Sequence, residues 1–378
     1  MSDRCILGIE TSCDETAAAV VSNGERLLAN VVSSQIATHQ PYGGVVPELA
    51  SREHLRAIVP VVRQALAESG KTYESIDAIA VTQGPGLAGA LLVGISYAKA
   101  LAFALDKPLI TVNHLEGHIH AVILEEKQKG NFQINFPLLA LVVSGGHTHL
   151  FLAKQKEQAW TYANIGRTRD DAAGEAYDKV AKLLGLGYPG GPVIDGLAKY
   201  GNPRAVKFGP SQIKHDNRGT PKDKQTPYDF SFSGIKTAVL RYVELEGMRD
   251  AVIARQQALA AVAKPTAEIV RTHCDQKTLD LVASFQRAVV EDLVKKTLQA
   301  AEEQNVRTLF VTGGVAANSE LRDRFTVEAA KGGLPVYFPS RKLSTDNAAM
   351  IATAAFPKLW AGDFAETDFS AEASLVLR

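Results

Sequence analysis

Two histidines, His114 and His118, are the residues whose type and spacing most directly suggest chemistry, in the stretch NHLEGHIHA. On a helix, residues four apart lie one above the other on one face, and two imidazoles so placed can chelate one metal ion. As a bare pattern, such a pair is more often two surface or core histidines. His120 lies about 200° around the helix from His118, so we do not expect it to join the same site.

Glu116 distinguishes this pattern from the HExxH pattern of zinc peptidases. In those enzymes the glutamate is a general base that must reach the metal-bound water. Glu116 occupies the third position of HLEGH, about 200° around the helix from His114. It therefore points away from a metal held by the two histidines, and we predict no proteolytic activity.

Asp346 is the candidate for a third metal ligand, in the polar run STDN at 344–347. The ordinary interpretation of this run is a helix cap formed by Ser344 or Thr345. The alternative is that Asp346 meets His114 and His118 across a cleft. Two imidazoles and one carboxylate leave positions open for a substrate, and such a set suits iron(II) or zinc.

Two glycine turns are candidates for nucleotide binding, Ser144-Gly-Gly and Gly313-Gly-Val-Ala-Ala-Asn318. Glycine lets the backbone approach a phosphate closely, although either turn alone could be simply a tight turn. Asp171, Glu175 and Asp178 follow a helical spacing. They indicate either contacts to ribose hydroxyls or a solvated face paired with lysines.

The elements that must position these residues occur twice along the chain. The first unit is a strand, a polar turn and a returning strand; the second is a strand, a glycine turn and a helix; the third is a short strand that leads into a helix. The paired stretches are 5–21 with 138–153, 76–89 with 306–318, and 108–114 with 335–348. The repeat predicts two duplicated α/β lobes, 1–130 and 131–378, with a cleft between them.

Two segments of the second lobe lie outside the repeat and are interpreted as insertions. Residues 201–229 are rich in Gly, Pro, Asn and Lys, and 245–300 are mostly helical with a break at Pro265. Residues 199–224 carry seven Lys or Arg against two Asp. This excess indicates either a contact to a nucleic-acid backbone or a charged, mobile loop. The final helix is a candidate to pack back on the first lobe.

Composition restricts the class of protein. The 378 residues carry 41 basic and 41 acidic side chains, so no global positive field attracts nucleic acid. The three cysteines, Cys5, Cys13 and Cys274, form no CxxC pair, which fits a reducing compartment and excludes a thiolate zinc site. The start MSDRC does not resemble a signal peptide, and the apolar run 91–105 is predicted to be a buried helix. We expect a cytoplasmic protein without a membrane segment.

Nine motifs, in order along the chain, resemble those of the bacterial TsaD family. They are GIETSCDET (8–16), GGVVPELASREH (43–54), TQGPGLAGALLVG (82–94), NHLEGHIHA (113–121), LVVSGGHTHL (141–150), DDAAGEAYDKVAKLLGLGYPGGP (170–192), FSFSGIKT (230–237), TGGVAANSELR (312–322) and STDNAAMIA (344–352). The family, once labelled O-sialoglycoprotein endopeptidase, transfers threonylcarbamoyl to tRNA. The resemblance implies an α/β fold of two RNase H-like lobes, as in actin, Hsp70 and sugar kinases (the ASKHA fold).

The resemblance also implies substrates, partners and site residues. The donor would be threonylcarbamoyl-adenylate, and the acceptor N6 of adenosine 37, 3′ of the anticodon, in tRNAs reading ANN codons; TsaB and TsaE would be partners. The metal ligands would be His114, His118 and Asp346, with Fe²⁺ favoured and Zn²⁺ the alternative. The nucleotide-binding positions would be Val142, Val143, Ser144, Gly145, Gly146, Asp178, Gly191, Asp195 and Asn318. No general base is assigned.

Two other function classes remain open from the residues themselves. A sugar or acid kinase on the same fold would need a catalytic Asp and would consume ATP. A non-catalytic actin-like module would cycle with nucleotide and would need neither His114 nor His118. A metal requirement therefore separates the transferase from the second alternative.

Overall fold

The first lobe is built on a five-stranded mixed sheet. The computed structural model describes residues 3–130, 132–156, 159–209, 226–260, 262, 265–366 and 368–378. The strand order is β3-β2-β1-β4-β5, in which β1, β2 and β3 are antiparallel and β4 and β5 run parallel to β1. The strands are β1 (Cys5–Glu10), β2 (Glu15–Ser22), β3 (Arg26–Ser34), β4 (Ala78–Gly84) and β5 (Leu109–Asn113).

The second lobe repeats this sheet strand for strand. Its order is β10-β9-β6-β7-β8, again with three antiparallel strands followed by two that run parallel to the first. The strands are β6 (Leu138–Val143), β7 (Thr148–Lys156), β8 (Ala159–Arg167), β9 (Thr308–Thr312) and β10 (Val336–Tyr337). The predicted duplication into two RNase H-like α/β lobes is confirmed.

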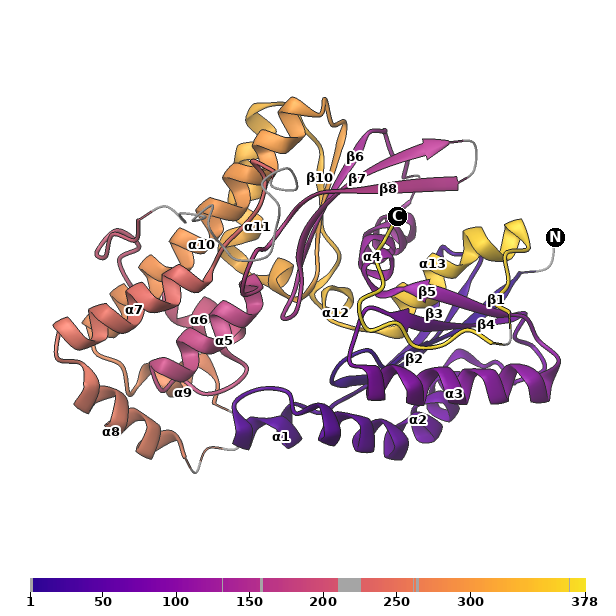
Figure 1. Ribbon diagram of the computed structural model, residues 1–378, viewed down its shortest axis with the longest axis horizontal. Coiled ribbons are helices and arrows are strands. Elements are labelled where there is room, and N and C mark those ends of the chain that lie inside the picture. The colour runs from indigo at the N-terminus through magenta and orange to yellow at the C-terminus, as the bar shows by residue number, and fades with distance from the viewer. Residues whose placement is uncertain are drawn as a thin grey trace.

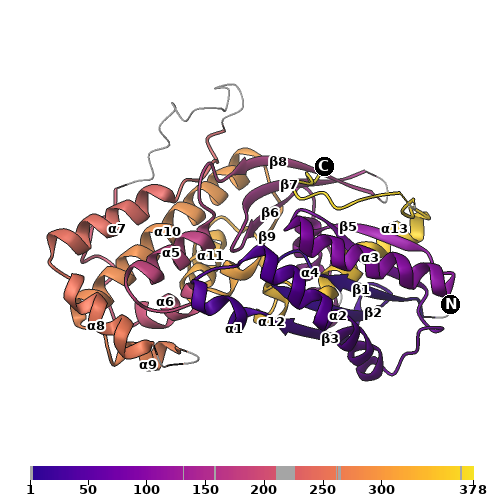
Figure 2. The same cartoon turned by 60° about the horizontal axis from the view of Figure 1, so that its bottom comes forward.

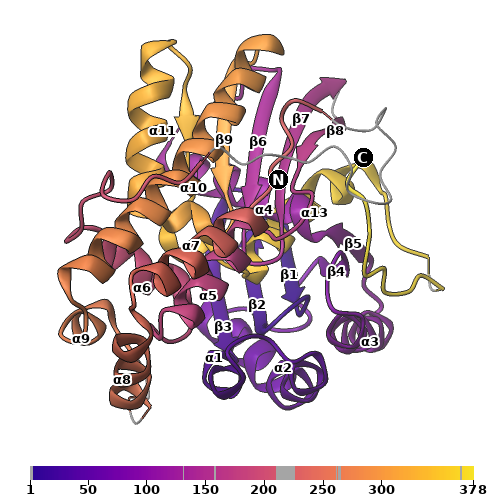
Figure 3. The same ribbon diagram turned by 60° about the vertical axis from the view of Figure 1, so that its left-hand side comes forward.

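Two helices lie between the sheets, α4 (His114–Lys129) and α13 (Ala348–Ala361) (Figures 1 and 3). Ala121 and Leu124 of α4 pack toward the first sheet, while Leu115 and Ile119 pack toward the second. α13 covers β1, β2, β4 and β5 and touches α4. It approaches β1 so closely that a Cβ on Gly8 would lie 2.4 Å from the Ala348 carbonyl oxygen. The last helix thus completes the first lobe, although it follows the second along the chain.

Two long helices cover the outer face of the first sheet, α2 (Pro47–Ser69) and α3 (Ala88–Leu105). A short helix, α1 (Ile36–His39), and the turn η1 (Gln40–Tyr42) precede α2.

Within the described residues, α3 is the one helix long and apolar enough to cross a membrane by length and composition, and 33% of it is buried. The prediction of a buried helix is therefore wrong for its outer side. There, Leu92 and Phe103 are exposed because α3 packs through one face only.

The outer side of the second sheet carries the helices of the larger lobe. α5 (Ala173–Leu183), α6 (Gly190–Ala198) and α10 (Gln276–Glu303) share its main apolar core. The turn η3 (Gly314–Ala317), α11 (Ser319–Lys331) and α12 (Arg341–Ser344) complete the lobe. α7 (Ser233–Leu245), α8 (Arg249–Leu259) and α9 (Ala267–Arg271) lie at the end of the molecule farthest from the N-terminus (Figure 2).

The insertion predicted at 245–300 is too long. α10 immediately precedes β9, as α2 precedes β4, and its Val282, Phe285 and Val289 are buried in the core of the second lobe. It therefore belongs to the duplicated lobe, and the insertion ends before it. Of the predicted loop at 201–229, residues 210–225 lie outside the described residues, and with them four of the seven basic residues and both aspartates of the stretch 199–224.

A candidate metal centre at the wall of the cleft between the lobes

The junction of β5 and α4 positions both histidines. β5 ends at Asn113, whose side-chain oxygen accepts a hydrogen bond from the Leu115 amide at 2.9 Å and so caps the helix. His114 is consequently the first helical residue, and His118 lies one turn later on the same face. Both are buried, and their rings meet edge to face with centroids 4.8 Å apart.

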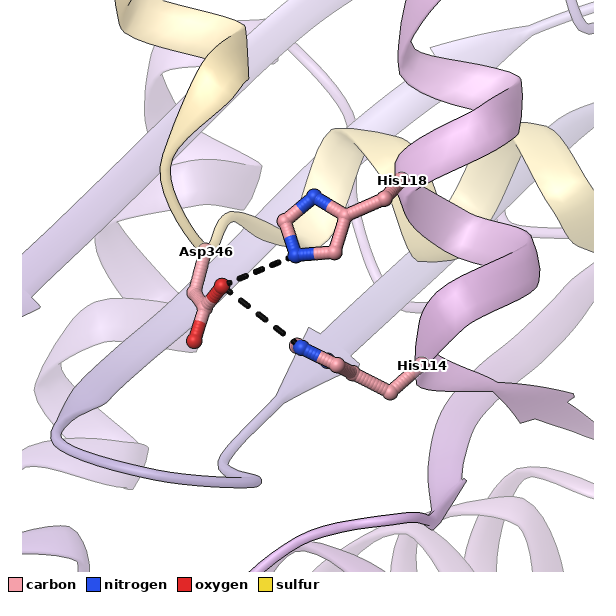
Figure 4. A group of neighbouring side chains, drawn as sticks. All are labelled: His114, His118 and Asp346. Atoms are coloured by element: carbon pink, nitrogen blue, oxygen red, sulfur yellow. Dashed lines mark ion pairs between the residues drawn. The ribbon is translucent and has the colours of Figure 1, made fainter. Parts of the chain in front are cut away.

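Asp346 joins the two histidines from the other copy of the repeat (Figure 4). Its Oδ1 lies 3.2 Å from His118 Nε2 and 3.6 Å from His114 Nε2, and one ligand atom from each residue lies within 4.8 Å of the others. Ligands bound to one transition metal at about 2.1 Å are separated by roughly 3 to 3.5 Å. The structure therefore brings the three predicted ligands together, with both separations from Asp346 close to this range and the third no longer than 4.8 Å.

His118 provides an independent test of whether a metal fits this cluster. Its Nδ1 has no hydrogen-bond partner among the described residues, and its Nε2 faces the Asp346 carboxylate at 3.2 Å without the geometry of a hydrogen bond, although both nitrogens are fully buried. A buried polar group without a partner is costly in free energy, and an Nε2 lone pair aimed at a cation would remove that cost. With a carboxylate opposite, the donor set fits a divalent ion.

Glu10 orients His114 from behind, and the sequence analysis did not single it out. Its carboxylate is fully buried and accepts from Ser12 N at 2.5 Å, from Thr82 Oγ1 at 2.7 Å and from His114 Nδ1 at 3.1 Å. A carboxylate on the far nitrogen fixes the tautomer that leaves Nε2 free for a metal. The available signal was its position at the end of β1, beside the carboxyl end of β4.

The imidazole of His114 and the carboxylate of Asp346 each stabilise the charged form of the other. Burial would lower the pKa of His114, but Asp346 and Glu10 outweigh it and raise that pKa to about 9. Burial would likewise raise the pKa of the Asp346 carboxyl, but His114 and His118 lower it below its ordinary value. In the absence of a metal, the site therefore holds a proton on His114 that a cation must displace.

The helix cap predicted near Asp346 comes from a different residue. Asn347 accepts a hydrogen bond from the Met350 amide at 3.1 Å and caps α13. Ser344 Oγ instead donates to the Ser340 carbonyl oxygen at 2.9 Å, so the expectation of a Ser344 or Thr345 cap is wrong. Because Asn347 caps the helix, the carboxylate of Asp346 is free to face the histidines.

Glu116 and His120 lie on the opposite side of α4 from the cluster. Glu116 Oε2 is 4.0 Å from Lys358 Nζ of α13, and the His120 ring lies against Trp160 at 5.4 Å. Burial, with nearby Lys127 and Lys358, lowers the pKa of His120 to about 3. Neither side chain contacts the three clustered residues, as the helical period predicts.

The first glycine turn connects directly to this cluster. The loop from Ser144 to Gly146 closes with a hydrogen bond from Ser144 N to the His147 carbonyl oxygen at 2.8 Å. The His147 ring lies 5.9 Å from that of His114. Burial, with the adjoining His114 and His149, lowers the pKa of His147 to about 3, so it adds no positive charge beside the cluster. His147 was not predicted as a site residue.

Several glycines of the predicted nucleotide site have open space where a side chain would be. A Cβ built on Gly145, Gly146, Gly191 or Gly314 meets no atom within 4 Å. Gly313, by contrast, requires glycine, because its φ is +95° and a Cβ would lie 2.4 Å from the Val143 carbonyl oxygen. The strand ends at Val142 and Val143 are buried, so these two residues position the turn rather than line its surface.

The predicted polar nucleotide ligands are occupied by internal hydrogen bonds. Asp178 Oδ1 accepts from Gly190 N at 2.7 Å, and Asp195 Oδ1 accepts from Ser319 Oγ at 2.8 Å. Asn318 Oδ1 caps α11 through Leu321 N at 2.9 Å, while its amide nitrogen donates to Gln286 Oε1 at 2.7 Å. These side chains fix the ends of α6 and α11, and their contact with a nucleotide stays a prediction.

The carboxylate stripe on α5 divides into two parts. Asp171 and Glu175 pair with Lys179 at 2.6 and 2.9 Å, as expected of a solvated face. Asp178 instead lines a cavity of about 620 Å³ between η1 and the second lobe. Burial raises the pKa of Asp178 to about 6, and the negative charge of Asp14 adds to this rise. The hydrogen bond from Gly190 lowers the pKa but does not cancel the effect of burial. Lys182 Nζ crosses this cleft to the Tyr42 carbonyl oxygen at 3.3 Å.

Comparison with known proteins gives consistent matches along the chain. Residues 26–353 match the family TsaD, tRNA N6-adenosine threonylcarbamoyltransferase. Proteins of that name from Koribacter versatilis and Symbiobacterium thermophilum are 68% and 49% identical to this chain. They align with all of it and with 100% and 98% of their own lengths. A solved activator of 2-hydroxyisocaproyl-CoA dehydratase from Clostridium difficile is 13% identical, with a TM-score of 0.46 over 97% of this chain and 99% of its own.

Proposed function

Because the chain belongs to the TsaD family of tRNA N6-adenosine threonylcarbamoyltransferases, we propose that it transfers threonylcarbamoyl from threonylcarbamoyl-adenylate to the exocyclic amine of the adenosine beside the tRNA anticodon, with release of AMP. The observation that carries the proposal is the cluster of His114, His118 and Asp346, next to a glycine turn with open space above it. The cluster suits an oxygen-rich group of the substrate, and the turn suits its phosphate.

The resident metal in this proposal is Fe²⁺, with Zn²⁺ as the alternative, held by His114, His118 and Asp346. When bound, such an ion supplies Lewis acidity and a template for the threonyl moiety. Two observations support this assignment: His118 Nε2 makes no well-formed hydrogen bond and faces the Asp346 carboxylate at 3.2 Å, and a second carboxylate, that of Glu10, lies behind His114.

The chain itself would bind and orient the two substrates. The adenylate is already activated, so the amine can attack the carbamoyl carbonyl carbon without a side-chain nucleophile. The bond from that carbon to the phosphate oxygen breaks, AMP leaves with its electron pair, and the proton lost from the amine passes to solvent. Positioning and fixed dipoles then carry most of the acceleration. The backbone of Gly145 and Gly146 leaves room for the phosphate, next to His147 and the cluster.

We place the reaction in the cytoplasm, with TsaB and TsaE as protein partners and tRNA as the acceptor. A protein partner is supported by the exposed apolar side chains of Leu55, Leu92 and Phe103 on α2 and α3. Because the net charge of the chain is zero, the chain alone has no general electrostatic attraction for tRNA. We therefore expect a complex with its protein partners to bind tRNA better than the isolated chain does.

The test combines the purified protein, TsaB, TsaE, synthetic threonylcarbamoyl-adenylate and unmodified tRNA, followed by mass spectrometry of the digested tRNA. We expect threonylcarbamoyladenosine with the native chain and with His273→Ala, which removes an exposed imidazole of the second lobe. We expect none with His114→Ala/His118→Ala. Absence of product from the native chain with active partners would reject the transfer activity. Full product from the double variant would reject the metal role.

A further inference from the structure

A second cavity lies behind α4, on the side away from His114 and His118, and the proposed transfer reaction does not use it. Its volume is about 860 Å³. α4 and α13 form one wall, while residues 132–136 and the β7–β8 hairpin supply the other, so both lobes contribute. The volume falls within the range of pockets that bind small organic molecules.

Aromatic rings form much of this back cavity. Phe132, Phe136 and Trp160 come from the second-lobe side, and Phe356 and Trp360 come from α13. Trp160 meets Phe136 edge to face at 5.0 Å, which fixes its plane, whereas Trp360 is 59% exposed and open to a ligand. Indole faces of this kind are surfaces on which planar heteroaromatic rings stack.

Glu116 and Lys358 provide polar groups in the same cavity. The Glu116 carboxylate is 15% exposed and accepts no hydrogen bond from any residue that the structure describes. Its neighbouring cation, Lys358 Nζ, is 4.0 Å away and also donates to the Thr111 carbonyl oxygen at 2.8 Å. The carboxylate is therefore under-satisfied and available to an N–H donor.

We propose that the back cavity binds a purine-type nucleobase, stacked on Trp360 and hydrogen-bonded to Glu116 and Lys358. A carboxylate and an ammonium group side by side present an acceptor next to a donor. This pattern complements the amino group and the adjacent ring nitrogen of adenine. The base could belong to a free nucleoside or to a nucleotide of bound RNA, and only the RNA source rests on the proposed function.

The charges around the cavity favour a neutral base over an ion. Lys127 is paired with Glu25 at 3.0 Å, so the remaining charges of the lining are Glu116 and Asp363 against Lys358. An organic cation at Glu116 would meet Lys358 beside it, and a carboxylate ligand would meet two acids. A neutral ring with paired donor and acceptor atoms satisfies Glu116 and Lys358 without an unpaired charge.

Tryptophan fluorescence tests the proposal directly, because Trp160 and Trp360 are the two tryptophans of the chain and both line the back cavity. We expect saturable quenching by adenosine. Glu116→Gln should weaken binding by about tenfold or more, since it removes a charge-assisted acceptor. Trp360→Ala should weaken it about 5- to 150-fold, the cost of one lost stacking surface, with Trp160 still reporting. Leu245→Ala, which removes an exposed side chain from α7, should leave it unchanged.

Two comparisons identify the ligand chemistry and its source. Purine riboside lacks the amino group and should bind less tightly than adenosine. Unmodified tRNA that quenches the native chain but not Glu116→Gln would identify an RNA nucleotide, whereas quenching by adenosine alone would identify a small molecule. No saturable quenching by either ligand, unchanged affinity in both variants, or equal binding of purine riboside would overturn the proposal. A protein that modifies tRNA without quenching would reject this cavity and retain the transfer function.

Discussion

Two groups of polar side chains were predicted to serve the cleft, and the fold holds them in opposite ways. At the cluster of His114, His118 and Asp346, two imidazoles and a carboxylate converge, and within the described residues the only polar group that faces a His118 nitrogen is the Asp346 carboxylate. At the predicted nucleotide site, the side chains of Asp178 and Asn318 accept hydrogen bonds from backbone amides at the first turns of α6 and α11. The difference indicates that side-chain chemistry is available at the cluster, while the nucleotide side offers mainly backbone and shape.

The largest expected effect comes from removing a side chain of the cluster. We expect His118→Ala to abolish stable metal binding and to lower the rate of transfer at least about 1000-fold, because a Lewis acid supplies several kcal/mol of stabilisation. Metal content after dialysis and the rate of tRNA modification measure the two effects. His273→Ala is the matched control. A His118→Ala variant that retains metal and rate would show that His118 Nε2 is not a ligand.

The pH dependence of metal binding should be the next largest effect. The pKa of His114 is raised to about 9 in the metal-free protein, and a metal needs the neutral ring. Metal affinity should therefore rise by about tenfold per pH unit up to pH 9 and then level off. Calorimetric titrations from pH 6 to 10 measure this slope. A flat profile below pH 9 would show that His114 binds no proton that a metal displaces.

The stability of the metal-free protein should change in the opposite direction. The folded pKa of His114 exceeds its ordinary value of 6.5, so proton binding contributes stability that is fully present below pH 6.5 and lost as pH rises through about 9. The contribution is on the order of 3 kcal/mol. Thermal melts of metal-free native protein and of His114→Gln should converge above pH 9. A difference in melting temperature between the two proteins that stays constant over the whole pH range would contradict this linkage.

A smaller effect is expected from the carboxylate behind the cluster. Glu10→Gln keeps the shape of the side chain but weakens the orientation of His114, and such changes cost about 10- to 100-fold in metal affinity. Thr82→Val removes only a bond to Glu10 and should have a lesser effect in the same direction. If Glu10→Gln binds metal as tightly as the native chain, then the burial of His114 alone sets its orientation.

The repeat in the sequence was sufficient to predict the fold, because each lobe uses the same strand order and the same strand-turn-helix units. The limits of the insertion were not predictable from periodicity. α10 and α8 both have helical patterns, and only the packing of residues such as Phe285 against the second sheet shows that α10 belongs to the lobe. The exposed side of α3 was missed for a related reason, since an apolar run does not show which of its faces is covered.

The candidate site was predictable where spacing alone determines direction. His114, His118 and Glu116 occupy fixed angles on one helix, so the shared direction of the two histidines and the opposite direction of Glu116 followed from the period of α4, while their assignment as metal ligands came from the family resemblance. Glu10 and His147 could not be found this way, because they reach the cluster from β1 and from the turn after β6. The contact of Glu10 depends on the strand order of the first sheet, and that of His147 depends on the packing of the two lobes.

Asn318 gives the smallest but most direct test of the comparison between the two groups. Asn318→Ala removes the cap of α11 and should cost about 1 kcal/mol of stability, measured by thermal or urea unfolding. Asn318→Ser keeps a capping oxygen and should restore most of that loss. If the side chain serves the helix rather than the ligand, the serine variant should also bind AMP as the native chain does. A stable serine variant with AMP affinity reduced tenfold or more would show that the amide contacts the nucleotide, and the two groups would then differ less than their hydrogen bonds indicate.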